Sequence, residues 1–348
     1  KHGGDLIWQV GTGYFGCRNK DGTFNDEMYK EKASMDQVKM IELKLSQGAK
    51  PGHGGILPAA KNSPTIAEIR GVKPNTTVDS PPAHSAFSTP IEMMMFIQKL
   101  RDLSGGKPIG FKLCIGRKSE FVALCKAMVK TNIKPDFITV DGGEGGTGAA
   151  PLEYSNSVGM PLREALIYVC DVLKGFDLKK DIKVIASGKT FSGFHLVRNI
   201  AMGADICNSA RGMMVALGCV QSLECHTNKC PTGIATQNPE LAQGLVVSDK
   251  ATRIARYHKE TVDAVLDIVS STGLDSHEKL TRSHIFRRVS QTEIKRYDEI
   301  YPSITQGCLL TKEYPEQFKQ EMQESSVDTF MPQVYVVECT GGLKEQSA

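Results

Sequence analysis

The chain of 348 residues carries 42 lysines and arginines against 39 aspartates and glutamates, which gives a formal net charge of +3 at pH 7. Its hydrophobic content of 40 % and charged content of 23 % are those of a globular protein, and no apolar run approaches the roughly 18 residues of a membrane span. The positive charges are spread along the chain, so nucleic acid is not an expected partner.

Short apolar segments alternate with segments of helical spacing through the first two thirds of the chain. Strands are expected at Leu6–Val10, 40–45, 108–115, 137–140, 184–186 and 204–207, and helices at 26–37, 90–103, 119–131, 161–174, 191–202 and from 213 onward. Six strand–helix units in series predict a parallel sheet, either doubly wound or in a barrel. A long polar loop over 50–90 interrupts this alternation, and loops of that length in a compact domain are usually functional.

The pattern changes beyond Pro239. Residues 249–269 have the apolar spacing of a helix, and 280–300 are rich in arginine and lysine and are expected to form short helices. The segment from Thr311 onward is polar apart from the apolar run 334–337. The chain therefore divides into a sheet-and-helix domain over 1–235, a helical extension over 236–310 and a poorly specified tail over 311–348.

Three cysteines, Cys219, Cys225 and Cys230, follow the spacing C-x5-C-x4-C, and Pro231 comes directly after the last. Thiolates this close in sequence can converge on one iron–sulfur cluster, and a proline often follows the last ligand. Three ligands without a clustered fourth favour a three-iron cluster. Two alternatives stay open: zinc with His226 as fourth ligand, despite the missing C-x2-C pairs, and burial of three structural cysteines. Ten cysteines without an even framework, together with a cluster, indicate a reducing, cytoplasmic compartment.

Two loops, Ser187-Gly188-Lys189 and Ser209-Ala210-Arg211-Gly212, each follow a predicted strand and open a predicted helix. Backbone N–H groups at such a turn point at a bound anion, and the helix dipole favours negative charge. Barrel enzymes bind phosphate with the loops that follow their last two strands. The sequence therefore predicts a phosphate site here, with ordinary turn-forming glycine and serine as the alternative.

Four ordered segments resemble the glutamate synthases: KLSQGAKPGHGGILP at 44–58, VDGGEGGTGAAP at 140–151, SGKTFSGFHLVRNIAMGADICNSARG at 187–212 and CHTNKCPTGIATQ at 225–237. The resemblance extends from the first residues to about Leu310. It is particularly strong for the short, stand-alone FMN-binding members of this family. It implies that 1–235 is an FMN-binding synthase domain with the fold of a TIM-type (β/α)8 barrel. It also implies that Cys219, Cys225 and Cys230 hold a 3Fe-4S cluster beside the FMN.

The resemblance assigns roles to individual residues. The FMN site would comprise Gln47, Lys112, Asp141, Gly142, Gly143 and the two phosphate loops, Ser187, Gly188, Lys189 and Ser209, Ala210, Arg211, Gly212. A 2-oxo acid would bind Lys50, Gly52 and Arg70, and Lys50, Arg70 and Lys112 would take part in catalysis. A dicarboxylate needs a cation at each carboxylate, preferably one bidentate arginine. His84 is expected to be structural.

Three positions depart from the synthase pattern. Glu144 stands where the synthases tend to carry aspartate, and His53 stands where they usually carry glutamate. Ile56 replaces a glutamine that touches the substrate in the family, which leaves the exact substrate open.

The resemblance implies a function: reduction of 2-iminoglutarate, formed from 2-oxoglutarate and ammonia, to L-glutamate, with electrons entering at the cluster and passing to FMN. No glutaminase domain is recognised, so ammonia would come from solution or a separate glutaminase chain, and electrons from ferredoxin or a reductase subunit. A transferase subunit of the N-methylglutamate synthase type and a non-catalytic electron-transfer or sensing module are the alternatives.

Six strand–helix units are two fewer than a closed barrel contains. In the family, two further strands precede the segment that matches residues 1–5. The sheet is therefore expected to lack its first two strands and to have two open edges. We expect the chain to be a fragment, a cleavage product or one part of a pair with an upstream chain, and to associate, for example as a homo-oligomer, through these edges.

Overall fold

A six-stranded parallel sheet forms the centre of the computed structural model, which describes residues 2–145, 148 and 150–333. Its strands are β1 (Leu6–Val10), β2 (Val38–Lys44), β5 (Ile109–Leu113), β6 (Phe137–Asp141), β7 (Lys183–Ser187) and β8 (Ile206–Asn208). They pair in the order β1-β2-β5-β6-β7-β8, and every neighbouring pair is parallel. An order that follows the chain without reversal is that of a TIM-type barrel and not of a doubly wound sheet. The predicted fold, a partial barrel, is confirmed, and among the described strands β1 and β8 form its unpaired edges.

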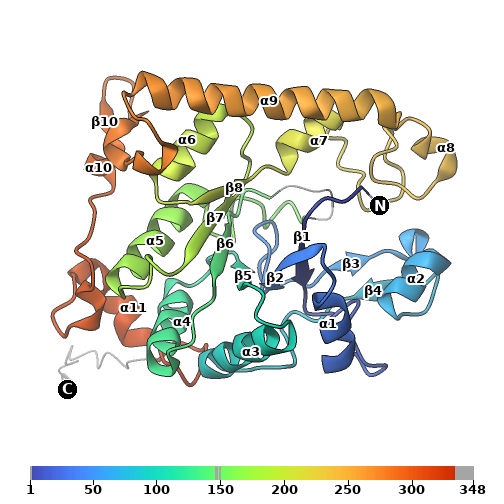
Figure 1. Ribbon diagram of the computed structural model, residues 1–348, viewed down its shortest axis with the longest axis horizontal. Helices are drawn as coiled ribbons and strands as arrows, with labels where there is room; N and C mark the ends of the chain where they lie inside the picture. The colour runs from blue at the N-terminus through green and yellow to red at the C-terminus, as the bar shows by residue number, and fades with distance from the viewer. Residues whose placement is uncertain (1, 146–147, 149, 334–348) are drawn as a thin grey trace, which may run out of the picture.

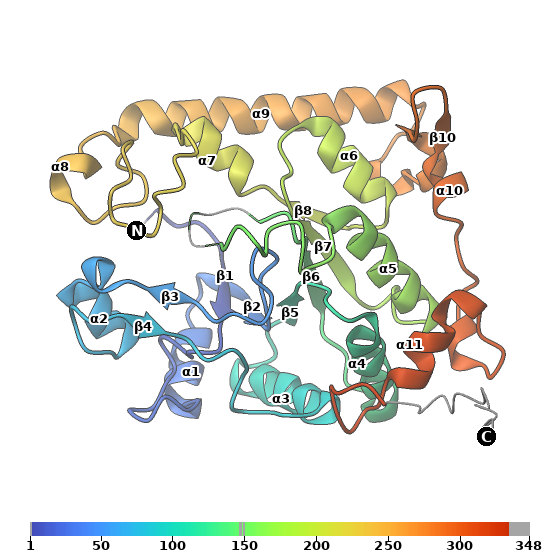
Figure 2. The same ribbon diagram turned by 180° about the vertical axis from the view of Figure 1, so that it is seen from behind.

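Each strand leads into a helix, and these helices lie around the outside of the curved sheet (Figures 1 and 2). They are α1 (Asp26–Ala33), α3 (Pro90–Leu103), α4 (Lys118–Thr131), α5 (Leu162–Gly175), α6 (Gly193–Ala201) and α7 (Arg211–Leu217). The prediction that the first helix continues to residue 37 is wrong, since α1 ends at Ala33. The ammonium group of Lys107 accounts for the early end, because it donates to the carbonyls of Ala33, Met35 and Val38 at 2.5, 2.8 and 2.6 Å.

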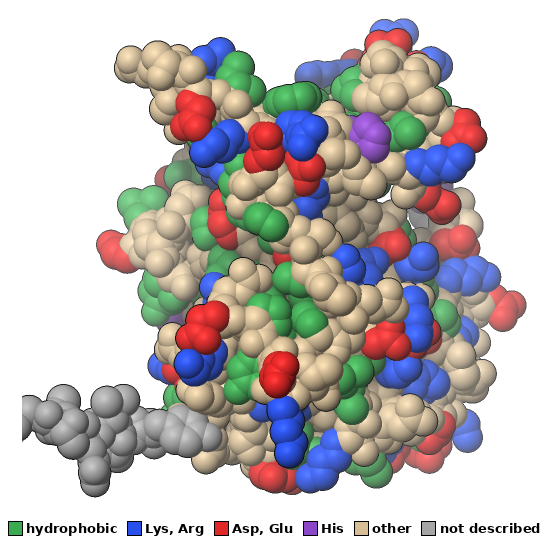
Figure 3. All heavy atoms as spheres, turned by 90° about the vertical axis from the view of Figure 1, so that its left-hand side faces the viewer, with side chains coloured by type: hydrophobic (Ala, Val, Ile, Leu, Met, Phe, Trp, Pro, Cys, Tyr) green, Lys and Arg blue, Asp and Glu red, His purple; other side chains and the backbone are tan. Residues whose placement is uncertain are grey.

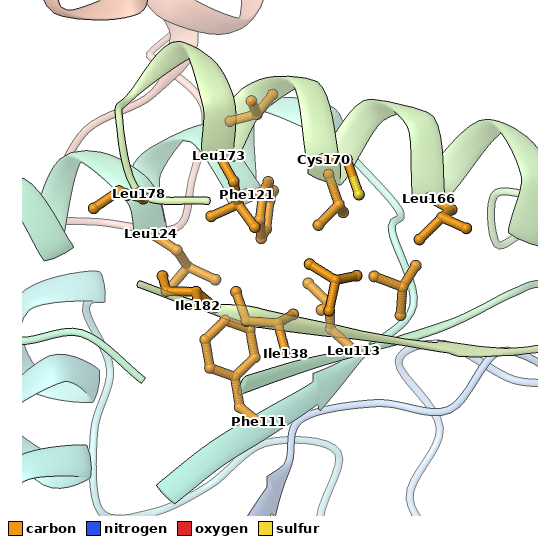
Figure 4. Close-up of a cluster of buried hydrophobic side chains, with 14 of the residues drawn as sticks. Phe111, Leu113, Phe121, Leu124, Ile138, Leu166, Cys170, Leu173, Leu178 and Ile182 are labelled. Atoms are coloured by element: carbon orange, nitrogen blue, oxygen red, sulfur yellow. The ribbon is translucent and has the colours of Figure 1, made fainter. Parts of the chain in front are cut away.

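The core lies between the outer face of the sheet and the helices. On β5, Phe111 and Leu113 point toward α4 and α5, whereas Lys112 between them points to the opposite face, because side chains alternate along a strand. Figure 4 shows the resulting cluster. Its labelled members are Phe111, Leu113, Phe121, Leu124, Ile138, Leu166, Cys170, Leu173, Leu178 and Ile182. Burying each large apolar side chain contributes about 1.5–3 kcal/mol.

The predicted loop over 50–90 contains regular structure. It forms β3 (Ile56–Leu57), the 3-10 helix η1 (Ala59–Lys61), α2 (Pro64–Arg70) and β4 (Val78–Asp79), which pairs with β3. The buried Asn62 amide donates to the carbonyls of Lys73 and Thr76 at 2.8 and 2.9 Å. These short elements depend on such side chain–backbone bonds, which hydrophobic periodicity does not reveal.

The chain after the barrel runs along one side of it. Following α8 (Pro239–Ala242), the long helix α9 (Val247–Ser271) crosses α6 and α7, which confirms the helix predicted over 249–269. The segment 280–300 differs from the prediction of short helices alone, because β9 (Phe286–Arg288) and β10 (Ile294–Arg296) form an antiparallel hairpin before α10 (Tyr297–Ile300). The remaining short helices are η2 (His277–Lys279), η3 (Arg282–His284), η4 (Cys308–Leu310), η5 (Glu316–Phe318) and α11 (Lys319–Glu324).

Part of the predicted tail is well packed. The helix α11 contacts α4, and Phe318 is buried in the core. The ammonium group of Lys126 on α4 donates to the carbonyls of Met322 and Ser325 at 2.7 and 3.0 Å. The apolar run 334–337 lies outside the described residues.

The surface carries charges of both signs. On the face drawn in Figure 3, lysine and arginine side chains are interspersed with aspartate and glutamate side chains. Within the described ranges, no helix is both long and apolar enough to cross a membrane. The nine cysteines of the described chain form no disulfide.

Candidate functional site

Polar side chains gather where the strands of the partial barrel end. Lys44 ends β2 and pairs in register with Lys112 on β5, while Asp141 at the end of β6 pairs with Ser187 at the end of β7. In parallel sheets all carboxyl ends lie at one edge, where barrel enzymes place their active sites. Four neighbouring strands therefore present polar groups at one mouth.

Asp141 connects several of these groups. One carboxylate oxygen, Oδ2, accepts from the backbone N–H of Gly48 at 3.0 Å and lies 3.3 Å from the Lys112 ammonium. The other, Oδ1, accepts from the Ser187 hydroxyl at 2.9 Å. The side chains of Lys112 and Asp141 are only 18 % and 17 % exposed, so their charges are partly desolvated and interact strongly. The carboxylate thereby fixes the position of the lysine.

A cavity of about 270 Å³ opens beside this ion pair. Most of the residues predicted to bind FMN line it: Gln47, Lys112, Asp141, Gly142, Ser187, Gly188, Lys189, Ala210 and Arg211. The sequence did not single out its other lining residues, Ala49, Gly145, Asn208 and Met214. We call this space the flavin-side cavity, after the FMN site that the resemblance implies.

Three residues of the predicted FMN site do not line this cavity as described. The hydroxyl of Ser209 donates to the Thr190 carbonyl at 2.8 Å. Gly143 donates its N–H to the Met160 carbonyl at 2.9 Å, and Gly212 packs against the Tyr257 hydroxyl. These three residues shape the backbone around the cavity.

The lining of the flavin-side cavity suits an anionic ligand. Lys189 and Arg211 supply positive charge at one side, and Lys189 has a φ of +43°, a left-handed conformation that non-glycine residues rarely adopt. Outliers of this kind cluster at ligand sites. The Lys112–Asp141 pair lies at the same cavity, where a cation could stabilise a reduced anionic flavin.

A second cavity of about 520 Å³ adjoins the first, and Gln47 lines both. Arg70 lies in its wall, with its guanidinium 4.8 Å from the centre of the Phe15 ring. Lys32 and Lys44 also line it, whereas none of the described residues around it is an aspartate or glutamate. A cationic cavity of this composition favours an anionic ligand. We call it the substrate-side cavity, after the 2-oxo acid site that the resemblance implies at Arg70. Two of the three departures from the synthase pattern, His53 and Ile56, line it.

Lys50 and Gly52 lie elsewhere. Lys50 is only 3 % exposed and, as described, lines neither cavity. Burial lowers the pKa of Lys50, and the charge of Asp79 partly opposes this. Gly52 borders a third, mainly apolar cavity of about 310 Å³. The structure thus separates Lys50 from Arg70, which the sequence had grouped together.

Sequence reasoning missed Lys44 and Glu42. The ammonium group of Lys44 donates to the Gln47 amide oxygen at 2.7 Å. Glu42, only 7 % exposed, accepts from the buried Thr139 hydroxyl at 2.5 Å and from the Gln9 amide. The sequence did contain a signal. Glu42 and Lys44 are two residues apart in the strand VKMIELK, so their side chains lie on the same face, and charged side chains within an otherwise apolar strand usually have a polar partner.

His84 is structural, as expected. Its Nε2 donates to the Lys44 carbonyl at 2.9 Å, so the neutral ring accepts at Nδ1 from the Tyr14 hydroxyl at 3.1 Å. Burial lowers the pKa of His84 to about 4, which keeps the ring neutral near pH 7. The residue ties the loop before α3 to the end of β2.

The loop with the three cysteines follows α7. Burial raises the pKa of Cys230, but hydrogen bonds from the Thr232 hydroxyl and from backbone N–H groups of Ala235, Thr232 and Ile234 outweigh it and lower the pKa to about 7. A thiolate is the form that binds iron. In the described part of the chain, however, no three His, Cys, Asp or Glu side chains are grouped closely enough to hold a metal ion. The donor set of Cys219, Cys225 and Cys230 suits an iron–sulfur cluster, and the loop as described does not bring the three sulfurs together.

Two contacts attach the cysteine loop to the cavities. The Lys61 ammonium of η1 donates to the carbonyls of Cys225 and Ala235 at 2.9 and 3.2 Å. Gly148, in the loop after β6, lies so close that an added Cβ would be 1.8 Å from the Leu223 carbonyl oxygen. The cysteine loop therefore packs against both the insert that carries Arg70 and the loop that borders the flavin-side cavity.

Comparison with known proteins identifies relatives. The model of the family described as the conserved region in glutamate synthase matches residues 1–275. A glutamate synthase large subunit-like protein, YerD of Bacillus subtilis, is 41 % identical over 300 residues, which are 86 % of this chain and 57 % of that protein. An archaeal NADPH glutamate synthase of Methanocaldococcus jannaschii is 32 % identical over 276 residues, 79 % of this chain and 51 % of its own. The chain thus spans about half the length of these curated relatives.

More distant similarities are also found. A ferredoxin-dependent glutamate synthase of Antithamnion is 31 % identical over 261 residues, 74 % of this chain and 16 % of that protein. Among solved structures, a mutant flavocytochrome b2 with pyruvate bound matches with a TM-score of 0.47 at 14 % identity, over 90 % of this chain and 62 % of that chain.

Proposed function

This chain belongs to the glutamate synthase family, and from that premise we propose that it reduces 2-iminoglutarate, formed from 2-oxoglutarate and ammonia, to L-glutamate. One observation carries the proposal: the substrate-side cavity, lined by cations, adjoins the flavin-side cavity, and Gln47 lines both. A hydride transfer requires substrate and flavin in contact, and this adjacency provides for it.

FMN would be held by the residues of the flavin-side cavity. Lys189 and Arg211 would bind its phosphate, and Gln47 and Lys112 would contact the ring. Bound FMN would supply the hydride. Lys112 is already oriented by Asp141, so its charge needs no rearrangement when negative charge develops nearby.

The substrate carboxylates would bind Arg70 and the lysines of the substrate-side cavity. Arg70 offers a planar fork that matches a carboxylate, and its stacking on Phe15 limits the rotamers it can adopt. Lys50, which is buried outside both cavities, would support the insert in place of contacting the substrate.

A 3Fe-4S cluster on Cys219, Cys225 and Cys230 is part of the proposal. The lowered pKa of Cys230 and the anchoring of the loop by Lys61 support it. Closing the three sulfurs on one cluster requires local rearrangement of this loop. Ferredoxin or a reductase subunit would supply electrons, a separate glutaminase chain could supply ammonia, and a reducing cytoplasm would suit the free cysteines.

Spectroscopy of the full chain, purified without oxygen, tests both cofactors. We expect a flavin absorption spectrum at one FMN per chain and a cluster signal in low-temperature EPR of the oxidised protein. Cys230→Ser should lose the cluster signal, whereas Cys308→Ser, outside the loop, should retain it. Full-chain protein without flavin, or a Cys230→Ser variant with the complete signal, would overturn the respective assignment.

A second candidate is a related amination with another amine. Ile56 lies in the wall of the substrate-side cavity with 51 % of its surface exposed, and it offers no amide to a polar substrate group. An N-methylglutamate synthase-type activity would show dependence on methylamine in place of ammonium. Flavin that cycles between redox states without converting any 2-oxo acid would instead indicate an electron-transfer module.

A further inference from the structure

Lys44 occupies the boundary between the two cavities. It lines the substrate-side cavity, and its ammonium group donates to the amide oxygen of Gln47, which lines both cavities. It is also the cross-strand neighbour of Lys112 in the flavin-side cavity. Lys44 therefore lies where a substrate bound by Arg70 would face the flavin.

Few other groups around the substrate-side cavity can exchange a proton. Of the titratable side chains that the described residues place there, Arg70 stays charged at all relevant pH values. His53 is exposed and packs its ring against Tyr154, with 5.1 Å between ring centres. Lys32 comes from α1 and lies next to Gly16, on the wall formed by the loop after β1. Lys44 alone among them also contacts a residue of the flavin-side cavity.

The charges that face Lys44 favour loss of its proton. Partial burial lowers its pKa, and the nearby charge of Lys112 lowers it further, while Asp141 opposes this; smaller effects come from Lys50, which lowers the pKa, and Glu42, which raises it. Glu42 is itself engaged by Thr139 and Gln9, and Asp141 by Lys112, Ser187 and Gly48. Neither carboxylate forms a direct ion pair with Lys44 among the described residues.

We propose that Lys44 is a catalytic residue that transfers the protons needed for imine formation. This role rests on the proposed function and supplies the general acid–base group for that reaction. The Lys44 side chain starts as the ammonium that donates to Gln47, and ammonia enters the cavity. Ammonia attacks the C2 carbonyl of the 2-oxo acid and forms a carbinolamine. The Lys44 ammonium then gives a proton to the hydroxyl group, the C–O bond breaks to release water, and the nitrogen lone pair forms the C=N bond. The neutral Lys44 amine then takes a proton from the next ammonium ion, which restores its charge and releases ammonia for the next turnover. One 2-oxo acid and one ammonium ion thus give one iminium ion and one water.

Isotope exchange tests this step without any electron donor. The full chain, supplied with FMN that is kept oxidised, is incubated with 2-oxoglutarate labelled with ¹⁸O at C2, and loss of the label is followed by mass spectrometry with and without ammonium. We expect the wild type to accelerate the ammonium-dependent loss. Lys44→Met and Lys44→Arg should both slow it by about a hundredfold or more, because general acid–base catalysis contributes roughly 10²–10⁴-fold.

The arginine variant separates proton transfer from charge. Arginine keeps the positive charge but does not release its proton, so Lys44→Arg should bind 2-oxoglutarate with a dissociation constant close to that of the wild type and still fail in exchange. Lys39→Met, an exposed position on the same strand, is the matched control and should exchange like the wild type.

The outcomes distinguish the two levels of the proposal. Wild-type exchange that persists in Lys44→Arg would overturn the role of Lys44 and leave the proposed amination intact. A wild type without ammonium-dependent exchange would overturn both, because imine formation precedes reduction.

Discussion

At the scale of single residues, the mouth of the barrel consists of charges that orient one another. Asp141 holds Lys112, Ser187 and the Gly48 N–H in fixed positions, while Lys44 is oriented by Gln47. Arg70, by contrast, is positioned by an aromatic ring and keeps its donors available for an incoming carboxylate. Preorganised charges of this kind lower the cost of reorganisation during a reaction.

Arg70→Ala should weaken 2-oxo acid binding more than Lys50→Ala. Arg70 lines the substrate-side cavity, and losing a desolvated, bidentate charge pair costs on the order of 2–4 kcal/mol. Lys50 is buried outside that cavity, so its loss should reduce stability more than affinity. Calorimetric titration with 2-oxoglutarate measures both dissociation constants, and equal effects of the two substitutions would contradict this placement.

His84 should make the protein acid-sensitive. The fold lowers the pKa of His84 to about 4 from its ordinary value of 6.5. Between pH 6.5 and pH 4, His84 is therefore protonated in the unfolded chain but remains neutral in the folded protein. The free energy of unfolding should therefore fall as pH drops from 6.5 to 4, by about 2 kcal/mol already between pH 7 and pH 5. Urea denaturation at the two pH values measures this loss. His84→Gln should show a smaller difference between them, and an unchanged pH dependence would refute the role of this ring.

At the scale of elements, the site depends on loops that approach one another at the backbone. The loop after β2 touches the loop after β6: a Cβ at Gly48 would lie 1.7 Å from the Gly142 carbonyl oxygen. The insert with β3, η1, α2 and β4 carries Arg70 on one side and clamps the cysteine loop through Lys61 on the other. These elements have little regular structure of their own, and contacts between loops define their positions.

Gly48→Ala should impair flavin binding. The added methyl group cannot be accommodated without moving the Gly142 backbone, which lines the flavin-side cavity, and overpacking of this kind typically costs about 1–3 kcal/mol. We expect the dissociation constant for FMN, measured by flavin fluorescence, to rise by at least about tenfold. Gly116→Ala is the control, because a Cβ there meets no atom within 4 Å. Equal FMN affinity in both variants would show that the loops separate freely.

At the scale of the whole molecule, the segment that follows the barrel contributes to the stability of the barrel. Helix α9 lies across α6 and α7, and α11 packs on α4, the helix that follows β5 in the middle of the sheet (Figures 1 and 2). Buried Phe318 and the bonds of Lys126 to the carbonyls of Met322 and Ser325 join this segment to the core. The barrel therefore depends on the C-terminal third of the chain for its packing.

Phe318→Ala should destabilise the whole protein. Truncating a buried phenylalanine costs about 3–5 kcal/mol, whereas Phe286→Ala, at a side chain that is 59 % exposed, should change the stability by no more than about 0.5 kcal/mol. The chain has one tryptophan, Trp8, which lies on β1 at the far edge of the sheet. If unfolding is cooperative, the urea midpoint read from Trp8 fluorescence shifts with Phe318→Ala. A shift seen by circular dichroism but not by Trp8 would mean that the C-terminal segment unfolds separately.

The sequence by itself determined the alternation of strands and helices, the parallel sheet and the family, and it predicts anion binding at the loops 187–189 and 209–212. These features are encoded locally, since hydrophobic periodicity and turn residues act over a few positions. Only the tertiary structure decided that Arg70 faces a cavity while Lys50 is buried, and that Lys44 lies between the two cavities. It also decided how the insert folds and where the helix α1 ends, through bonds from Asn62 and Lys107 to backbone carbonyls. The physical reason is that such contacts join residues far apart in the chain, and strand register and loop packing, which no local pattern specifies, bring them together.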